Sequence, residues 1–248
     1  MATSTATPTY RTATLRDVQG IAECAAEGML EDELFAALWP RRKEYPSHYA
    51  AYFARRARQR LVDQNIVTLI AELPIADEKG VVRNRIVGFA QWQRFGGGSV
   101  ETRWSPLKAC ERRLLAVEEW VTSFFTPKVD PASDPEAVSA FSRDFAELEN
   151  IYWHPSGIEH GRWHLQLLCV SSNARRKGIG GKLVDLGVER AKRDGCDASL
   201  EASPMGLPLY QARGFEVIGV YKMEVKGADG EGISTPVLLW RNPNKLDS

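Results

Sequence analysis

The 248-residue sequence has few cysteines and histidines, and neither type is arranged as a metal site requires. The four cysteines are scattered and form no Cys-x-x-Cys pair, which disfavours a zinc site and a disulfide framework. Of the four histidines, His154, His160 and His164 lie near one another, but no carboxylate or cysteine pattern completes a ligand set. The sequence therefore predicts no bound metal.

The sequence also lacks an excess of either charge and lacks long apolar runs. Lysine plus arginine and aspartate plus glutamate number 32 each, so we expect no nucleic-acid partner. No stretch approaches the roughly 18 apolar residues that span a bilayer, and the N-terminus has no apolar signal-peptide core. We expect a disordered tail over 1–8 and a cytoplasmic or nucleocytoplasmic protein with no membrane partner. Arg11 and Arg16 leave mitochondrial targeting open as an alternative.

The remaining chain, 9–248, shows strand and helix patterns of a single domain. The β-rich runs 66–72 and 86–93, separated by a polar segment, predict an antiparallel hairpin. An apolar helical face follows Asp17, and a second helical stretch covers 47–63. From residue 164 the order is strand, helix, strand, short helix, strand and strand. This order predicts a mixed α/β architecture.

Residues 99–160 interrupt this pattern. The segment is polar and contains two helical stretches, 108–125 and 135–150. We interpret it as a helical insertion before the central strand and not as a separate domain. Its aromatic residues either line a pocket or pack the inserted helices together; they are Trp104, Trp120, Phe124, Phe125, Tyr152 and Trp153.

A buried-strand pattern over 164–170 leads into a basic, glycine-rich turn. The turn opens a helix that runs to residue 193. Glycines let backbone N–H groups approach phosphate oxygens, the helix N-terminus adds its positive dipole end, and basic side chains neutralise charge. The sequence therefore predicts a pyrophosphate site made of Arg175, Arg176, Lys177, Gly178, Ile179, Gly180, Gly181 and Lys182.

Spacing within the turn separates the ligands that use such a site. A P-loop needs a glycine five positions before Gly181 and a Ser or Thr after Lys182, but Arg176 and Leu183 stand there. A dinucleotide-binding turn needs a third glycine three residues after Gly180, and that position is again Leu183. What remains is the pattern Arg175-x-x-Gly178-x-Gly180.

This pattern resembles the acyl-CoA signature of the GNAT superfamily of N-acetyltransferases, Gln/Arg-x-x-Gly-x-Gly/Ala. The sequence 209–215, Leu-Tyr-Gln-Ala-Arg-Gly-Phe, is similar to a second motif of that family and follows after a helix and a strand. The resemblance covers about residues 162–226. It implies the GNAT fold, a mixed central β-sheet flanked by helices.

The resemblance also implies how acetyl-CoA is bound. Backbone groups of Leu168 and Val170 would pair with the pantetheine arm, Cys169 between them would belong to the same cofactor site, and the turn would hold the pyrophosphate. Many family members have an asparagine seven residues before the motif tyrosine, where this sequence has Ser203. Either the Ser203 hydroxyl replaces that contact with pantetheine, or the contact is lost.

Tyr210 corresponds by resemblance to the general acid of the family, a phenol that protonates the departing CoA thiolate. The general base stays open. His164 stands where protein-acetylating relatives have a glutamate, and the alternatives are Glu201, Glu159 and a water chain. The implied reaction is direct acetyl transfer to the primary amine of a small molecule or peptide, by a monomer or homodimer. The alternative is a non-catalytic CoA-binding or regulatory module.

Overall fold

A mixed β-sheet organises the computed structural model, which describes residues 7–76, 80–96, 106–122, 130–153 and 161–244. Within those residues seven strands follow the order β1-β2-β3-β4-β5-β7-β6. Neighbouring strands are antiparallel, except that β4 and β5 are parallel. The predicted mixed α/β architecture is confirmed. The strands are β1 (Thr9–Thr12), β2 (Ile66–Ala76), β3 (Val82–Phe95), β4 (Arg162–Val170), β5 (Asp197–Glu201), β6 (Glu216–Lys226) and β7 (Gly232–Trp240).

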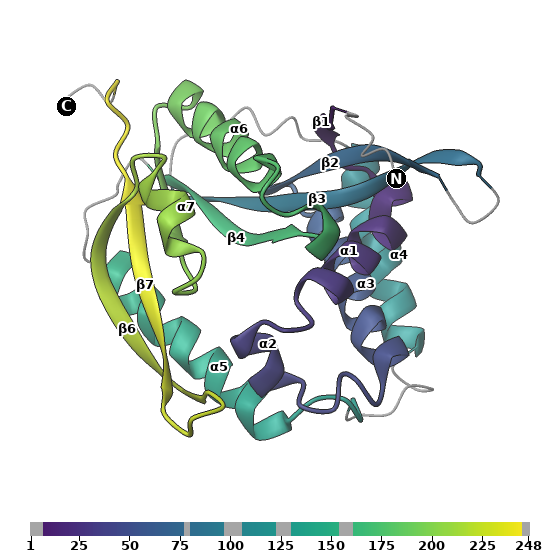
Figure 1. Cartoon of the computed structure of the whole chain (residues 1–248), viewed down its shortest axis with the longest axis horizontal. Helices are drawn as coiled ribbons and strands as arrows, with labels where there is room; N and C mark the ends of the chain where they lie inside the picture. The colour runs from purple at the N-terminus through teal and green to yellow at the C-terminus, as the bar shows by residue number, and fades with distance from the viewer. Residues whose placement is uncertain (1–6, 77–79, 97–105, 123–129, 154–160, 245–248) are drawn as a thin grey trace.

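Helices cover both faces of this sheet (Figure 1). Helix α6 lies on one face, while α1 and α3 lie on the other. The sequence analysis did not predict α2, because six residues give fewer than two turns of helical periodicity. The helices are α1 (Val18–Gly28), α2 (Glu33–Leu38), α3 (Pro46–Val62), α4 (Pro106–Thr122), α5 (Pro135–Leu148), α6 (Ile179–Arg193) and α7 (Leu207–Gln211).

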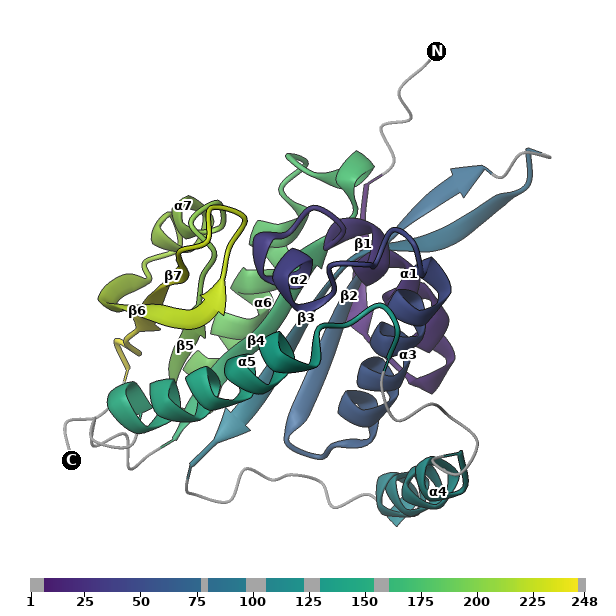
Figure 2. The ribbon, with the colours of Figure 1, turned by 90° about the horizontal axis from the view of Figure 1, so that it is seen from below.

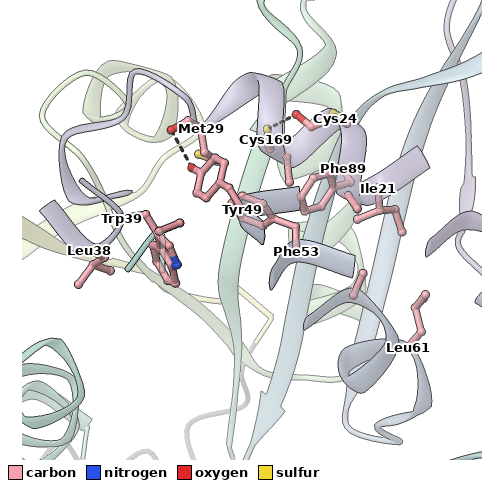
Figure 3. Packing of buried hydrophobic residues seen from close by; sticks show 14 of the residues in the cluster. Ile21, Cys24, Met29, Leu38, Trp39, Tyr49, Phe53, Leu61, Phe89 and Cys169 are labelled. Carbon is pink, nitrogen blue, oxygen red and sulfur yellow. Dashed lines mark hydrogen bonds between the residues drawn. The ribbon is translucent and has the colours of Figure 1, made fainter. Parts of the chain in front are cut away.

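The face under α1 and α3 is a dry cluster of aromatic and aliphatic side chains (Figure 3). Ile21 of α1 and Phe53 of α3 pack with Phe89 of β3 in this cluster. The Tyr49 hydroxyl donates a hydrogen bond to the Met29 carbonyl oxygen at 3.2 Å, which fixes α3 against the end of α1. Burying such side chains contributes about 1.5–3 kcal/mol each relative to exposure.

The opposite face is closed by α6, whose apolar side faces β3, β4 and β5. Leu183 and Val184 pack there with Leu165 and Leu200. Gly187 lets the helix approach the sheet closely, because a Cβ atom at this position would lie 2.0 Å from Cε2 of buried Trp92. The missing side chain of one residue thus sets the distance between helix and sheet.

The two helices of the insertion lie in different places (Figure 2). Helix α4 packs outside α3, where Arg58 donates two hydrogen bonds to the Glu118 carboxylate, at 2.8 and 2.6 Å. Helix α5 packs against β6, where buried Asp144 accepts hydrogen bonds from the backbone N–H groups of Glu224 and Val225. The carboxylate replaces a strand partner, so α5 is held to the sheet edge by hydrogen bonds as well as packing.

The described aromatic residues of the insertion differ in how far they are buried. Trp153 is buried at the end of a π-helical turn, Glu149–Trp153, and Tyr152 packs beside it. Trp120 is 65% exposed on α4. Trp104, Phe124 and Phe125 lie outside the described residues. Tyr152 packs against Gly219 of β6, and Trp153 donates a hydrogen bond to Glu201 of β5.

We predict that Gly187→Ala lowers the free energy of unfolding by about 1–3 kcal/mol, because the added methyl group collides with the Trp92 ring. Urea denaturation followed by circular dichroism measures this change. Glu189→Ala, on the exposed side of the same helix, is the control and should leave the free energy nearly unchanged. A Gly187→Ala protein as stable as the control would show that the helix–sheet distance is not fixed by this contact.

Candidate active site

Strands β4 and β5 separate after a short paired segment. They pair only from Arg162 with Asp197 to Leu165 with Leu200. Beyond that point β4 continues to Val170, and an extra residue, Gln166, interrupts its register with β3. Such a bulge bends a strand and strengthens its twist. The second half of β4 therefore has one edge that no described strand covers; we call this the β4–β5 gap.

Backbone alternation shows which groups of β4 face the gap. The Ser171 N–H donates to the Val87 carbonyl oxygen at 2.9 Å, so Ser171 faces β3. In an antiparallel pair, successive residues direct their N–H and C=O groups to opposite sides. Leu168 and Val170 therefore face the gap, as a peptide-like ligand would require. Cys169 faces β3.

Cys169 thus differs from the prediction that groups it with the ligand contacts. Its buried thiol donates a hydrogen bond to the Cys24 carbonyl oxygen of α1 at 3.4 Å (Figure 3). A Cβ atom at Gly28 would lie 2.4 Å from the Cys169 sulfur, so only glycine allows α1 to end there. Cys169 holds α1 against β4 and does not line the gap.

The glycine-rich turn follows β4 directly and presents unpaired N–H groups. Arg176 and Gly178 have positive φ angles of 60° and 77°, and no side chain caps α6 at Gly178. The first-turn N–H groups, of Ile179, Gly180 and Gly181, have no acceptor among the described residues. The exposed basic residues around the turn are Arg175, Arg176, Lys177 and Lys182. This geometry suits an anion at the helix N-terminus.

Arg175 forms hydrogen bonds within the fold beside the turn, and its help in holding the pyrophosphate stays a prediction. Its Nη2 atom donates to the Gly28 carbonyl oxygen at 2.6 Å, and its Nε atom donates to the Val170 carbonyl oxygen at 3.2 Å. The guanidinium group therefore joins the ends of α1 and β4. The motif position was found from the sequence, whereas this structural contact of the side chain was not.

Arg213 links the two sequence motifs, which the sequence analysis did not foresee. Its Nε atom donates to the Gly181 carbonyl oxygen and its Nη1 atom to the Leu209 carbonyl oxygen, each at 3.0 Å. Nε also lies 3.0 Å from the Asp185 carboxylate. Helix α7 is thus fixed to the first turn of α6. No sequence signal marked Arg213, because it occupies a variable position of the second motif.

Tyr210 is held in α7 beside this link. Its side chain is 7% exposed and packs edge-on against Phe215, with ring centroids 6.1 Å apart. Burial raises the pKa of its hydroxyl above the ordinary value of 10.0, so the phenol stays protonated at neutral pH.

Ser203 is exposed just after β5, where its Oγ atom accepts a hydrogen bond from the Gly206 N–H at 3.2 Å.

A chain of polar groups lies on the sheet face opposite α6. His164 Nε2 lies 2.9 Å from Glu201 Oε2, and His164 Nδ1 lies 2.9 Å from Ser199 Oγ. With Nε2 donating to the Glu201 carboxylate, a neutral imidazole accepts from the Ser199 hydroxyl at Nδ1. Trp153 Nε1 donates to Glu201 Oε1 at 3.3 Å. The side chain of His164 is 1% exposed and that of Glu201 is 13% exposed, so this group of polar side chains reaches solvent at Glu201.

The remaining histidine and acid candidates cannot be placed. His154, Glu159 and His160 lie outside the described residues. Among the residues that the structure describes, no group of three His, Cys, Asp or Glu side chains is arranged to hold a metal ion. No helix in the same part of the chain combines the length and apolar character that a bilayer crossing needs.

Two cavities lie away from the β4–β5 gap. One of about 290 Å³ is lined by α1 and the β2–β3 hairpin, and one of about 730 Å³ lies beside β1 and the end of α6. Neither includes the glycine-rich turn or Tyr210. The site assignment therefore rests on the backbone geometry of the gap and not on an enclosed volume.

Known proteins resemble this chain in sequence. A family model described as an acetyltransferase (GNAT) domain matches residues 156–229, which hold the gap, the turn and Tyr210. An acetyltransferase of Stachybotrys chartarum is 24% identical over 240 residues, which cover 93% of this chain and 90% of the relative.

Two solved structures show the same fold. A Corynebacterium glutamicum protein, named as histone acetyltransferase HPA2 and related acetyltransferase, has a TM-score of 0.56 at 20% identity, with 95% of this chain and 96% of that chain covered. Polyamine N-acetyltransferase of Drosophila melanogaster, which forms N-acetylagmatine, has a TM-score of 0.56 at 12% identity, with 95% and 100% covered.

We predict that Gly180→Ala retains CoA binding and Gly180→Glu loses it. A Cβ atom at Gly180 would lie 3.5 Å from Val170 Cγ2 and 3.7 Å from Leu209 Cδ2, which is ordinary contact. A carboxylate placed at the anion site repels phosphate, and we expect affinity to fall by more than about tenfold, or 1.4 kcal/mol. Calorimetric titration with CoA measures both variants. Equal binding by the two folded variants would mean that the turn does not hold the pyrophosphate.

Proposed function

Because the chain belongs to the GNAT superfamily and is an acetyltransferase, we propose that it transfers the acetyl group of acetyl-CoA to a primary amine of a small molecule or peptide by direct attack. The observation that carries the proposal is the β4–β5 gap. The glycine-rich turn follows the strand on one side of this gap, and Tyr210 follows the strand on the other side. The gap suits the extended donor, the turn suits its pyrophosphate, and the phenol suits its leaving thiolate.

The donor fits the gap as an added strand. The amides of a pantetheine arm offer N–H and C=O groups along an extended chain, as a peptide strand does. Leu168 presents its N–H and C=O groups along the uncovered edge of β4, and Val170 presents its N–H group, since its carbonyl oxygen accepts from Arg175. The pyrophosphate then meets the unpaired N–H groups at the start of α6. We expect the exposed side chains of Lys177 and Lys182 to neutralise the remaining phosphate charge.

In the reaction, the acceptor nitrogen attacks the thioester carbonyl carbon and forms the new C–N bond. The backbone N–H of Val170 polarises the carbonyl oxygen as negative charge develops on it. The C–S bond then breaks, and Tyr210 gives its proton to the departing thiolate sulfur. Its buried phenol is suited to this donation because it remains neutral until it acts.

The acceptor enters as an ammonium ion and has to lose a proton before it attacks. That His164 itself takes this proton stays a prediction from the sequence. The geometry supports an indirect role, in which His164 holds the carboxylate of Glu201. Glu201 is the solvent-facing member of the polar chain and stands where β5 ends beside the gap. His164 and Trp153 each hold one of its carboxylate oxygens. We therefore propose Glu201 as the group that receives the proton and His164 as a positioning residue.

The same residues favour a small cationic amine as the acceptor. The Glu201 carboxylate at the end of β5 attracts an ammonium group through its charge. Trp153 of the insertion donates a hydrogen bond to this carboxylate, while the face of its ring is covered by the Arg162 guanidinium, 4.6 Å from the ring centroid.

Calorimetric titration with acetyl-CoA, CoA and ATP tests the donor site, and thiol release with a panel of amines tests turnover. We expect both CoA species to bind and ATP not to bind, with thiol released only when an amine is present. Binding without turnover by any amine would favour the alternative, a regulatory CoA-binding module. Absence of CoA binding would reject the proposed donor.

We predict that Tyr210→Phe lowers kcat by about 10²-fold or more, because the thiolate then leaves without a proton donor. The dissociation constant for CoA should change little, since the ring remains. Steady-state thiol release and calorimetry measure the two quantities separately. Full activity in Tyr210→Phe would remove this residue from the mechanism.

The pH profile of the wild-type enzyme provides a second measurement on Tyr210. An acid with a raised pKa loses its proton only as pH rises through that value, so Tyr210 should cause no loss of kcat below pH 10. A descending limb below that pH which disappears in Tyr210→Phe would contradict this assignment.

We predict that Glu201→Gln lowers kcat/KM by about 10²-fold at neutral pH and recovers part of the loss as pH rises. At high pH the free amine is already deprotonated, so the missing proton acceptor matters less. The exposed Glu189→Gln variant removes the same charge from α6 and should behave as wild type. A uniform loss at every pH would indicate a structural role for Glu201.

A further inference from the structure

Helix α4 has an exposed apolar stripe that the proposed reaction does not use. The helix lies at the periphery of the molecule, contacts α3 through the Arg58–Glu118 pair and buries Leu115 (Figure 2). Beside this contact, five apolar positions spaced three or four residues apart are exposed to solvent. These are Leu107, Cys110, Leu114, Val117 and Val121.

The spacing of the stripe is that of a coiled-coil seam. Steps of three, four, three and four residues place Leu107, Leu114 and Val121 at a positions and Cys110 and Val117 at d positions. Leu107 is 67% exposed and Leu114 is 64% exposed. A helix in water that already packs one side on its own domain has no need of a second apolar stripe, so this stripe marks a contact surface.

We propose that the α4 stripe joins two copies of this chain in a parallel, two-fold helix pair. A two-fold contact uses the same patch on both subunits, so the apolar stripe meets its own copy. Like side chains then face each other along the seam, Leu114 with Leu114 and Val117 with Val117. The inference does not depend on the proposed function.

The charges beside the stripe select the parallel direction. Arg113 stands at a g position, and Glu118 stands at the following e position. In a parallel pair the g residue of one helix faces this e residue of the other, which brings opposite charges together twice. An antiparallel pair would instead place e positions together, and those are Glu111 and Glu118. In the parallel pair, Arg113 of one copy contacts Glu118 of the other copy, whose carboxylate already binds Arg58 and has lone pairs for both groups.

The same charges argue against a membrane surface as the partner. The α4 sequence holds three basic and three acidic residues. Amphipathic helices that bind anionic lipid carry an excess of Lys and Arg on their polar face. Helix α4 has no such excess.

Cysteine cross-linking tests the contact and its direction. Cys24, Cys169 and Cys196 are buried and Cys110 is exposed, so a mild oxidant such as diamide should act on Cys110. In the parallel pair the two Cys110 thiols lie opposite each other at d positions, and diamide takes two electrons and two protons from them to form one disulfide. We expect a disulfide-linked dimer on a non-reducing gel, and Cys110→Ser should abolish it.

Sedimentation analysis without oxidant tests the dimer itself. We expect the mass of two chains for the full-length protein, and a dissociation constant raised at least about tenfold in Leu114→Glu, which buries two carboxylates in the seam. Ala116→Glu adds the same charge to an exposed position of α4 outside the stripe and is the matched control. It should remain dimeric.

Three results would overturn the proposal. A wild-type protein that sediments as one chain at all attainable concentrations would exclude the dimer. A dimer that is equally stable in Leu114→Glu would place the interface elsewhere. A dimer that depends on Leu114 but does not cross-link through Cys110 would exclude the parallel direction.

Discussion

The bulge at Gln166, which ends the pairing of β4 with β5, is the constraint on which the site depends. Backbone N–H and C=O groups in a protein interior need partners, and the second half of β4 keeps one edge uncovered. An extended ligand supplies those partners at no cost in lost strand pairing. Both strand ends lead to parts of the site. The glycine-rich turn follows β4, and the segment that leads to Tyr210 follows β5.

Two arginines hold the sides of this opening in place. Arg175 binds carbonyl oxygens at the ends of α1 and β4, and Arg213 binds carbonyl oxygens of α6 and α7. The missing Cβ atom of Gly181 makes room for the Arg213 guanidinium group. Helix ends leave carbonyl groups unpaired, and a guanidinium group can satisfy two of them at once.

The donor side could be predicted from the sequence because its signals are local. A glycine at positive φ, a helix N-terminus and a basic turn all lie within one short segment, so Gly178 and its neighbours were found without the fold. The roles of Arg175 and Cys169 could not be found, because spacing does not reveal which distant carbonyl a side chain reaches. The polar chain from Ser199 to Trp153 depends on sheet register and on the docking of the insertion, and no local pattern encodes either.

The insertion between β3 and β4 has a consequence for the cost of folding. These strands are direct neighbours in the sheet, yet the chain from 96 to 161 separates them. The entropy lost on closing a loop grows only with the logarithm of its length, so replacing a tight hairpin by this segment costs about 2–3 kcal/mol. The buried Asp144 carboxylate, which accepts two backbone hydrogen bonds from β6, offsets a cost of that size. A fold of this kind can therefore gain or exchange whole helices at this junction without loss of its donor site.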